Sequence, residues 1–322
     1  MKVAAIVQAR MGSKRLPGKV LLEIGGRPML AWVVERLRRA KTLDAVIVAT
    51  STASEDDLLD KFCRKQGYPI ERGSLLDVLD RIYQAARRQA AEAIVRITAD
   101  CPFSDPGLID QAVRLFHSDE NAGFTPATGA SAEELDFLTN RLPPPWGRTT
   151  PIGLDIEICT FAVLERAWRE AKEPHQREHV MPYLYEDLPE DALRHGELLR
   201  QASDDVPRAL SAGQSQGNNS SDRKADRAKI PLMGTWRMAR AVSPQGLRLA
   251  QLHHDPDYGR SRWTVDTGED LTLAREIVSR FPDDRFGWLD LVELMMKEPH
   301  LAQINAGVIH KTARDSDLPL AP

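Results

Sequence analysis

The chain has 322 residues, enough to bury a large core and to form about two domains. Its 43 lysines and arginines face 47 aspartates and glutamates, which gives a formal charge of −4. This weakly acidic balance gives no global reason to expect binding to nucleic acid or to an anionic membrane. Any phosphate site must therefore be a local cluster of cations.

Cysteine usage and the first residues bear on the compartment. Cys63, Cys101 and Cys159 lie far apart in the sequence and fit neither a disulfide framework nor a paired-cysteine metal site. The apolar run 3–7 is too short for a signal sequence or a membrane span. Together these features predict a cytoplasmic protein.

Strand and helix patterns alternate along the first part of the chain. Short apolar runs predict strands, and apolar residues at helical spacing predict helices. The strands are expected at 3–7, 45–49 and 93–98, and the helices at 29–40, 55–66, 76–90 and 105–116. This order predicts a Rossmann-like α/β fold, with an open, mostly parallel sheet and helices on both faces. Ligands of such sheets bind where the strands end, so the loops after Val7 and Thr98 are expected to carry the chemistry.

Beyond about residue 121 the pattern is looser. Alternation predicts a strand at 153–161, followed by a helix at 161–172, a strand at 262–265 and a helix at 269–281. Residues 203–229 have few large apolar side chains and are expected to be mobile. The predicted division is an α/β half at 1–120, a looser segment at 121–202, a variable and mobile insertion at 203–258, and a carboxyl-terminal strand and helix at 259–322 that complete the first half.

The densest group of cations follows the first predicted strand. The run Gln8–Lys19 holds four cations, two glycines and one proline in twelve positions. Arginine offers a planar fork of donors, lysine a point charge, and glycine lets backbone amides approach an anion closely. We therefore predict that this loop binds the phosphates of a nucleotide. The alternative is a solvated basic turn.

Two familiar phosphate-binding loops do not fit this spacing. A P-loop has four residues between its glycines and Ser or Thr after its lysine. Here five residues separate Gly12 from Gly18, and Val20 follows Lys19. The dinucleotide-binding fingerprint fails because Arg10 stands where its first glycine belongs.

Two aspartates, Asp100 and Asp266, each follow a predicted strand and are candidate metal ligands. Mg²⁺ takes oxygen ligands, commonly one or two protein carboxylates with the rest from phosphates and water. We predict that the pair holds Mg²⁺ against a triphosphate. For Asp100 an ordinary turn role is the alternative. Thr267 and Asp270 have the spacing of a capping box, which leaves Asp266 free for a metal.

The run 7–19, followed by Leu21-Leu22 and Gly26–Leu30, resembles the opening of the sugar-acid cytidylyltransferases. These enzymes make CMP-activated sialic-type acids and CMP-ketodeoxyoctonate. The sequence is most similar to the spore-coat-polysaccharide branch, because Ala-Arg, Ser and Arg-Leu-Pro-Gly-Lys stand in register with its pattern. The resemblance implies a nucleotidyltransferase (GT-A-like) fold with a smaller inserted segment for dimerisation and sugar binding.

The resemblance also implies roles for single residues. Lys19 would neutralise charge on the α-phosphate and on the departing pyrophosphate, and it forms the expected catalytic set with Arg10 and Asp100. The expected nucleotide-binding residues are Gln8 and Ala9 near the cytosine, Arg10, Ser13, Arg15 and Lys19 at the phosphates, and Arg72 and Thr98 along the pocket.

Further motifs carry weaker signals. Asp80 and Arg81 lie in a segment that resembles the lining of the nucleotide pocket, although a helix-surface ion pair of Asp77 with Arg81 is an equally good interpretation.

Two stretches, 153–157 and 177–180, resemble spore-coat motifs. They make Asp155 and Glu157 candidate ligands of sugar hydroxyls and His179 a candidate proton acceptor. A structural histidine or a dimer-interface strand is the alternative here.

The predicted reaction converts CTP and a sugar acid into a CMP-sugar and pyrophosphate for cell-surface polysaccharide biosynthesis, with Mg²⁺ as cofactor. The resemblance implies a homodimer, and neither nucleic acid nor a membrane is an expected partner.

One alternative is a nucleotidyltransferase of the same fold that uses another NTP, but such relatives open with a glycine-rich loop where this chain has Gln8-Ala9-Arg10. Another is a glycosyltransferase, which would need a D-x-D motif that Asp100 and Asp266 do not form. A non-catalytic sugar-nucleotide-binding scaffold would be expected to lose the phosphate cations or Asp100.

Overall fold

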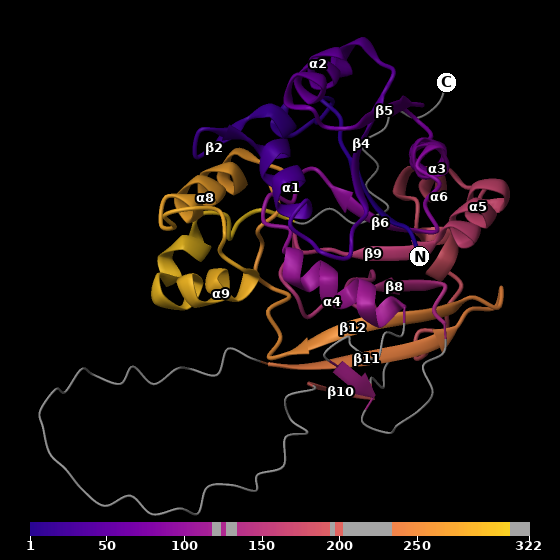
Figure 1. The fold of residues 1–322 in the computed structure, drawn as a ribbon. Coiled ribbons are helices and arrows are strands. Elements are labelled where there is room, and N and C mark those ends of the chain that lie inside the picture. Colours follow the sequence, from indigo (N-terminus) through magenta and orange to yellow (C-terminus); the bar gives the residue numbers. More distant parts are fainter. Residues whose placement is uncertain (118–123, 127–133, 194–196, 202–233, 310–322) are drawn as a thin grey trace, which may run out of the picture.

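The computed structural model describes residues 1–117, 124–126, 134–193, 197–201 and 234–309. Its centre is a sheet in the spatial order β5-β4-β1-β6-β9-β8-β12-β11-β10-β7, and β2 and β3 form a separate two-stranded ribbon (Figure 1). The strands are β1 Val3–Gln8, β2 Glu23–Ile24, β3 Arg27–Pro28, β4 Ala45–Ser51, β5 Ile70–Gly73, β6 Ala93–Thr98, β7 Phe124–Pro126, β8 Phe137–Thr139, β9 Glu157–Thr160, β10 Glu197–Gln201, β11 Thr235–Val242 and β12 Arg248–Asp255.

The first four strands of this order run parallel. β1 pairs with β4 on one side and with β6 on the other, and β4 pairs with β5. Gln8 lies opposite Thr98 in the register of β1 and β6, so these two strands end at the same level. The loop after β1 and the turn after β6 therefore leave the sheet side by side, as expected of a parallel sheet whose ligand site lies at the strand ends.

Helices cover both faces of the sheet. Alternate residues of β1 enter opposite cores, with Val3, Ala5 and Val7 on one face and Ala4 and Ile6 on the other. The first core includes side chains of α1, α2, α4, α8 and α9, and the second includes those of α3, α5 and α7 (Figure 1). The helices are α1 Met29–Leu37, α2 Asp57–Gln66, α3 Val78–Arg88, α4 Pro106–Phe116, α5 Phe161–Glu170, α6 Pro174–His179, α7 Pro182–Tyr185, α8 Gly268–Val278 and α9 Trp288–Lys297, with short 3-10 turns η1 Lys19–Leu21, η2 Ser54–Asp56 and η4 Pro299–Gln303.

The predicted fold class is confirmed, with an open sheet between two helical layers. From β9 onward the sheet is extended mainly by antiparallel pairs, although β8 and β12 run parallel. The strand 93–98 has its predicted bounds, and the side chain of Asp105 caps α4 by accepting a bond from Leu108 N at 2.8 Å.

Three predictions for the second half of the chain are wrong in part. The strand expected at 153–161 is only β9, because Gly153 adopts a φ of +106°, outside the range of a strand, and pairing with β6 and β8 begins only at Glu157. The strand expected at 262–265 is a single bridge between Ile152 and Arg262. Residues 235–242 and 248–255 are not a mobile insertion, because they form β11 and β12 of the central sheet, while residues 203–233 lie outside the described residues.

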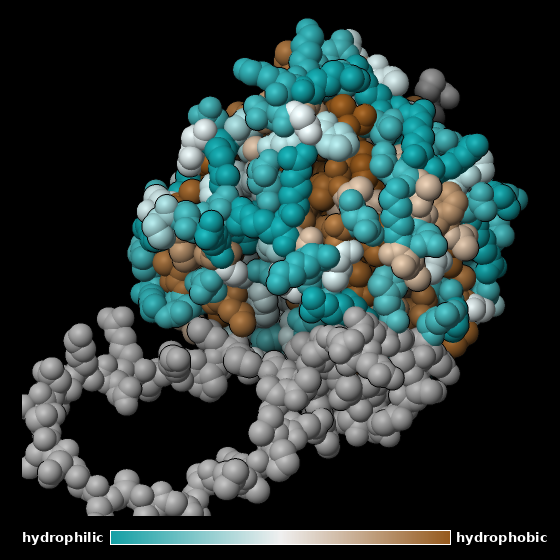
Figure 2. Space-filling view, viewed as in Figure 1, coloured by the Kyte–Doolittle hydropathy of each residue, from teal (hydrophilic) through white to brown (hydrophobic). Residues whose placement is uncertain are grey.

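The surface drawn in Figure 2 is mostly hydrophilic, with apolar side chains showing between charged ones. Within the described ranges, no helix combines the length and the apolar character that a membrane crossing requires.

Candidate active site

The loop after β1 is held in shape by its own backbone and by one buried carboxylate. Gly18 has a left-handed φ of +69° and donates its amide to Met11 O at 3.0 Å, which closes the loop before η1 begins at Lys19. Asp56 is 1% exposed, and its Oδ1 accepts a bond from Met11 N at 2.7 Å while Oδ2 accepts one from Ser51 N at 3.0 Å. The loop is therefore anchored to β4 before any ligand arrives.

A backbone contact brings the two aspartates together. Val265 N donates to Asp100 O at 2.8 Å, and the Thr264 hydroxyl donates to the same oxygen at 3.1 Å. Asp100 lies in the turn after β6, and Asp266 immediately precedes the Thr267 cap of α8. Residues that are far apart in the sequence thus meet at the end of the sheet.

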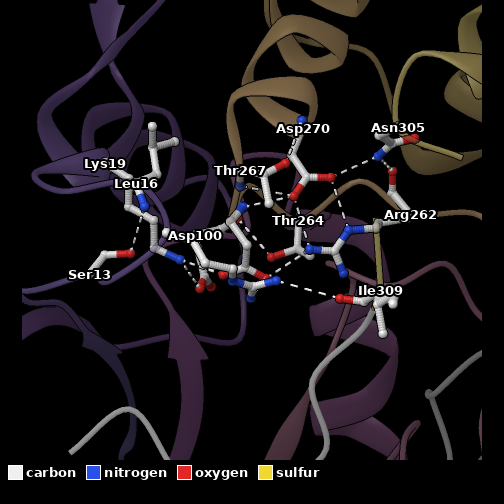
Figure 3. Close-up of polar contacts among 12 residues, drawn as sticks. Ser13, Leu16, Lys19, Asp100, Arg262, Thr264, Thr267, Asp270, Asn305 and Ile309 are labelled. Atoms are coloured by element: carbon white, nitrogen blue, oxygen red, sulfur yellow. Dashed lines mark hydrogen bonds and ion pairs between the residues drawn. The ribbon is translucent and has the colours of Figure 1, made fainter. Parts of the chain in front are cut away.

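Lys19 lies between these two carboxylates, and Figure 3 shows its side chain directed at Asp100. Its Nζ donates to Asp100 Oδ2 and to Asp266 Oδ1, each at 2.7 Å. The residue is 9% exposed, so its ammonium group is largely removed from water. Arg15 adds a second cation, with Nη2 at 3.0 Å from Asp266 Oδ2. The structure thus brings two of the four loop cations, Lys19 and Arg15, into contact with the aspartate pair.

Charge pairing shifts the pKa values of this group. Burial works to lower the pKa of Lys19, but the carboxylates of Asp100 and Asp266 outweigh it and raise that pKa above its usual value. Burial works to raise the pKa of Asp266, but Lys19, Arg15 and Arg262 outweigh it and hold that pKa well below its usual value. Lys19 and Asp266 are both therefore charged at neutral pH.

Asp266 is oriented by a buried network, of which Figure 3 labels Arg262, Asp270 and Asn305. Arg262 Nη2 donates to Asp266 Oδ2 at 2.8 Å, and its Nε and Nη2 each reach an oxygen of Asp270 at 2.9 Å. Asp270 also receives the backbone amides of Asp266 and Thr267, and Asn305 Nδ2 donates to it at 2.8 Å. The predicted capping box of Thr267 and Asp270 is confirmed. Because the cap uses Thr267 and Asp270, the Asp266 carboxylate is not needed for capping, and its Oδ1 accepts a bond from Lys19 Nζ.

A cavity opens in front of the Lys19 ammonium. It is lined by most of the residues that were predicted from the sequence to bind a nucleotide, and by both predicted metal ligands. Its lining is Gln8, Ala9, Arg10, Gly12, Ser13, Lys19, Val20, Thr98, Ala99, Asp100 and Asp266.

Arg72 does not line this cavity. Its Nε donates to Ser51 O at 2.8 Å, its Nη2 to Ala53 O at 3.0 Å, and its Nη1 pairs with Asp57 at 2.8 Å. The guanidinium is thus engaged with the loop after β4. Its predicted contact with the nucleotide has no support from this geometry.

Arg81 is a buried cation whose charge interacts with that of Arg10 in the loop after β1. It is 1% exposed, and of its side-chain nitrogens only Nη1 donates a hydrogen bond, to Ser74 O at 2.9 Å, while Nε and Nη2 have no partner among the described residues. Burial lowers its pKa to about 10, with Asp56 opposing and Arg10 adding to that shift. The predicted ion pair with Asp77 does not form, because Asp77 caps α3 and pairs with Arg177.

The candidate sugar-binding residues are divided between two places. Glu157 pairs with Arg96, and Arg96 also donates to the Gln8 side chain from Nη2 at 2.7 Å, which links this pair to the cavity. Asp155 pairs with Arg148 and lies 4.0 Å from Arg141 Nε.

His179 ends α6, a helix that packs on α3, and it is not among the residues that line the cavity.

Sequence reasoning missed the arginines that serve these carboxylates. Arg96 interrupts the apolar strand β6, and a charged residue inside a buried strand needs a partner. That pattern was visible in the sequence, although its partner Glu157 was not predictable from it. Arg262 carried no comparable signal, because it stands at the edge of a short apolar stretch.

Comparisons with known proteins agree with this geometry. Residues 4–203 match the family described as Cytidylyltransferase. A spore coat polysaccharide biosynthesis protein of Bacillus subtilis is 35% identical over 184 residues, which are 56% of this chain and 71% of that protein. A 3-deoxy-manno-octulosonate cytidylyltransferase of Geobacter sulfurreducens is 38% identical over 115 residues, which are 35% of this chain and 44% of that enzyme.

A solved structure extends the similarity beyond the matched sequence. A cytidylyltransferase from Leptospira borgpetersenii serovar Hardjo-bovis superposes with a TM-score of 0.69 at 28% identity, covering 96% of this chain and 100% of that one. The loop after β1, Gln8–Lys19, lies within the residues that match the family, and several of its residues line the cavity. This chain is an enzyme of the cytidylyltransferase family.

Proposed function

We propose that this cytidylyltransferase transfers CMP from CTP to a hydroxyl group of a sugar acid, with Mg²⁺ held by Asp100 and Asp266. The product would be a CMP-sugar for cell-surface polysaccharide biosynthesis. The observation that carries the proposal is the Lys19 ammonium group, which bridges the two carboxylates at the edge of a cavity lined by the phosphate loop.

The donor set fits a magnesium ion. One oxygen of Asp100 and one of Asp266 already converge on a single cation, the Lys19 ammonium. Across the described ranges no three His, Cys, Asp or Glu side chains gather into a metal site. Two carboxylates are sufficient for Mg²⁺, which commonly takes its other ligands from phosphates and water. When bound, the ion would neutralise charge on the triphosphate and help to orient it.

The reaction replaces one phosphorus–oxygen bond with another. The acceptor hydroxyl oxygen attacks the α-phosphorus in line and releases its proton to water, the bond from that phosphorus to the β-phosphate oxygen breaks, and pyrophosphate leaves with the electron pair. Arg10, Arg15 and Lys19 would hold the phosphate oxygens and stabilise the charge that develops on them. Gln8 and Ala9 would face the cytosine. This chain's contribution is therefore mainly positioning and charge stabilisation.

An arginine-rich flank supports an acidic acceptor. Within the described part of the chain, the ion pairs of Arg96, Arg141 and Arg148 involve only two carboxylates, Asp155 and Glu157. Arg141 is the least engaged, with a single contact at 4.0 Å. Guanidinium groups are suited to binding a carboxylate group, and Arg96 is linked to the nucleotide cavity through the Gln8 side chain. Asp155 and Glu157 would then orient these arginines more than they bind sugar hydroxyls.

The proposal is tested by measuring pyrophosphate release from each of the four NTPs with Mg²⁺ and a panel of sugar acids and neutral sugars, and by identifying the product by mass spectrometry. We expect product only with CTP and an acid. Asp100→Asn should lower turnover at least about a hundred-fold, because a metal ligand is lost. Glu276→Gln, which changes an exposed carboxylate on α8, should keep wild-type turnover.

Full activity of Asp100→Asn would refute the metal role, and turnover of neutral sugars alone would refute the acidic acceptor. Transfer of a sugar from a nucleotide sugar would favour a glycosyltransferase instead. The homodimer and the cytoplasmic location stay predictions, which light scattering and cell fractionation can test.

A further inference from the structure

The Lys19 ammonium group occupies a position defined by two carboxylates. Its Nζ is 2.7 Å from Asp100 Oδ2 and 2.7 Å from Asp266 Oδ1, so these two oxygens lie at most 5.4 Å apart. Oxygens bound to one Mg²⁺ each lie about 2.0–2.1 Å from the ion, so they are separated by about 4 Å or less. A small inward movement of either side chain would bring this pair into the range that a metal requires.

The other oxygen of Asp266 is held by different cations. Arg15 Nη2 lies 3.0 Å from Oδ2, and Arg262 Nη2 donates to Oδ2 at 2.8 Å. Departure of the lysine would therefore free Oδ1 while Oδ2 stays fixed. In Asp100 the lysine holds Oδ2, and among the described residues the only other side-chain contact of that carboxylate is from Cys101 Sγ to Oδ1 at 3.6 Å.

The lysine can leave without a change in the loop. Its backbone is fixed in η1, because Lys19 N donates to Leu16 O at 3.2 Å and Leu22 N donates to Lys19 O at 3.0 Å. Lysine carries its charge on a flexible four-carbon stem, so the ammonium can move several ångströms by rotation of the side chain alone. The adjoining cavity gives it space to move toward a phosphate.

We propose that Lys19 is a placeholder cation, which fills the metal position in the nucleotide-free enzyme and moves to the phosphates when CTP binds. This inference rests on the metal role of Asp100 and Asp266 in the proposed function. Two carboxylates this close repel each other unless a cation lies between them. The lysine supplies that cation and excludes a free divalent ion. A triphosphate offers the lysine a better partner, so the divalent ion enters together with the nucleotide.

The test is a titration of the nucleotide-free protein with Mn²⁺. The electron paramagnetic resonance signal of free Mn²⁺ reports how much of the ion remains unbound at each step. Wild type should bind Mn²⁺ weakly. Lys19→Met should bind it at least about ten-fold more tightly, because two carboxylates are left without their shared cation. Lys14→Met, which removes an exposed cation from the same loop, should match wild type. Adding Asp100→Asn to Lys19→Met should abolish the gain, which locates the ion.

Equal Mn²⁺ affinity of wild type and Lys19→Met would overturn the proposal. Lys19→Gln, checked by circular dichroism, replaces the methionine variant if the latter does not fold, with the same expected gain. The titration requires no turnover, so the two proposals can fail separately. If wild type transfers CMP but Lys19→Met does not bind Mn²⁺ more tightly than wild type, only the proposal that Lys19 is a placeholder cation is refuted. A Mn²⁺ gain without turnover of any NTP refutes only the proposed reaction.

Discussion

The ammonium nitrogen of Lys19 lies 2.7 Å from Asp266 Oδ1, although 247 positions separate the two residues in the chain. This contact joins the amino-terminal phosphate loop to the start of α8. It exists because Val265 donates its amide to Asp100 O, which draws the segment before α8 against the turn after β6. The geometry of the site thus depends on a few contacts that lie behind the carboxylates.

Removing the Arg262 side chain should destabilise the protein strongly. The Asp270 side chain is fully buried and receives two bonds from Arg262, so Arg262→Met leaves a buried carboxylate without its cation. We expect the free energy of unfolding in urea to fall by about 3–5 kcal/mol. Arg64→Met removes an exposed ion pair on α2 and should change it very little. Similar stability of the two variants would show that the buried network adds nothing.

Gly153 should not tolerate a side chain. Its φ of +106° is rare for other residues, and an added Cβ would lie 2.6 Å from Thr264 N. Because the backbone at Thr264 leads directly to Asp266, Gly153→Ala should lower both stability, by about 2 kcal/mol or more, and turnover. Gly268→Ala is the matched control, since a Cβ there meets no atom within 4 Å. Thermal unfolding measures the stability, and pyrophosphate release measures the turnover. If Gly153→Ala matched wild type in both, the close approach of residue 153 to the Thr264 backbone would be contradicted.

Replacing Arg81 should separate stability from ligand binding. Two of its nitrogens are buried without a partner among the described residues, so Arg81→Met should leave the melting temperature unchanged or raise it. If the predicted place in the nucleotide pocket is right, CTP affinity measured by calorimetry should fall about ten-fold or more, because charged hydrogen bonds are lost. Arg88→Met, an exposed position on the same helix, should alter neither. Unchanged CTP affinity would remove Arg81 from the site.

Acid should weaken the Asp266 ion pairs. The pKa of this carboxyl is held below its ordinary value of 3.8, so its contribution to stability is complete above pH 3.8 and is lost as the pH falls through the lower folded-state pKa. Wild type should therefore exceed Asp266→Asn in unfolding free energy by a constant amount from pH 5 to pH 8. Urea titrations should show that difference shrinking below pH 3.8. A difference that grows toward acid would reverse the assigned direction of the shift.

Local patterns were sufficient for much of the fold. The strand 93–98 and the capping residues Asp105 and Thr267 follow from apolar periodicity and side-chain chemistry within a few positions. The same patterns failed at 153–156 and 262–265, where the backbone conformation is set by a close approach between the two segments. Strands β11 and β12 were also missed, because their pairing with each other and with β8 depends on contacts with distant parts of the chain.

The sequence by itself determined the chemistry that is available: a cationic loop after a buried strand, and two aspartates that each follow an expected strand. The tertiary structure decided which of these groups meet. It placed Lys19 between Asp100 and Asp266, directed Arg72 to backbone carbonyls, and paired Glu157 with Arg96. Charge pairing acts over a few ångströms in space with no regard to sequence separation, so only the folded chain could show which cation serves which carboxylate.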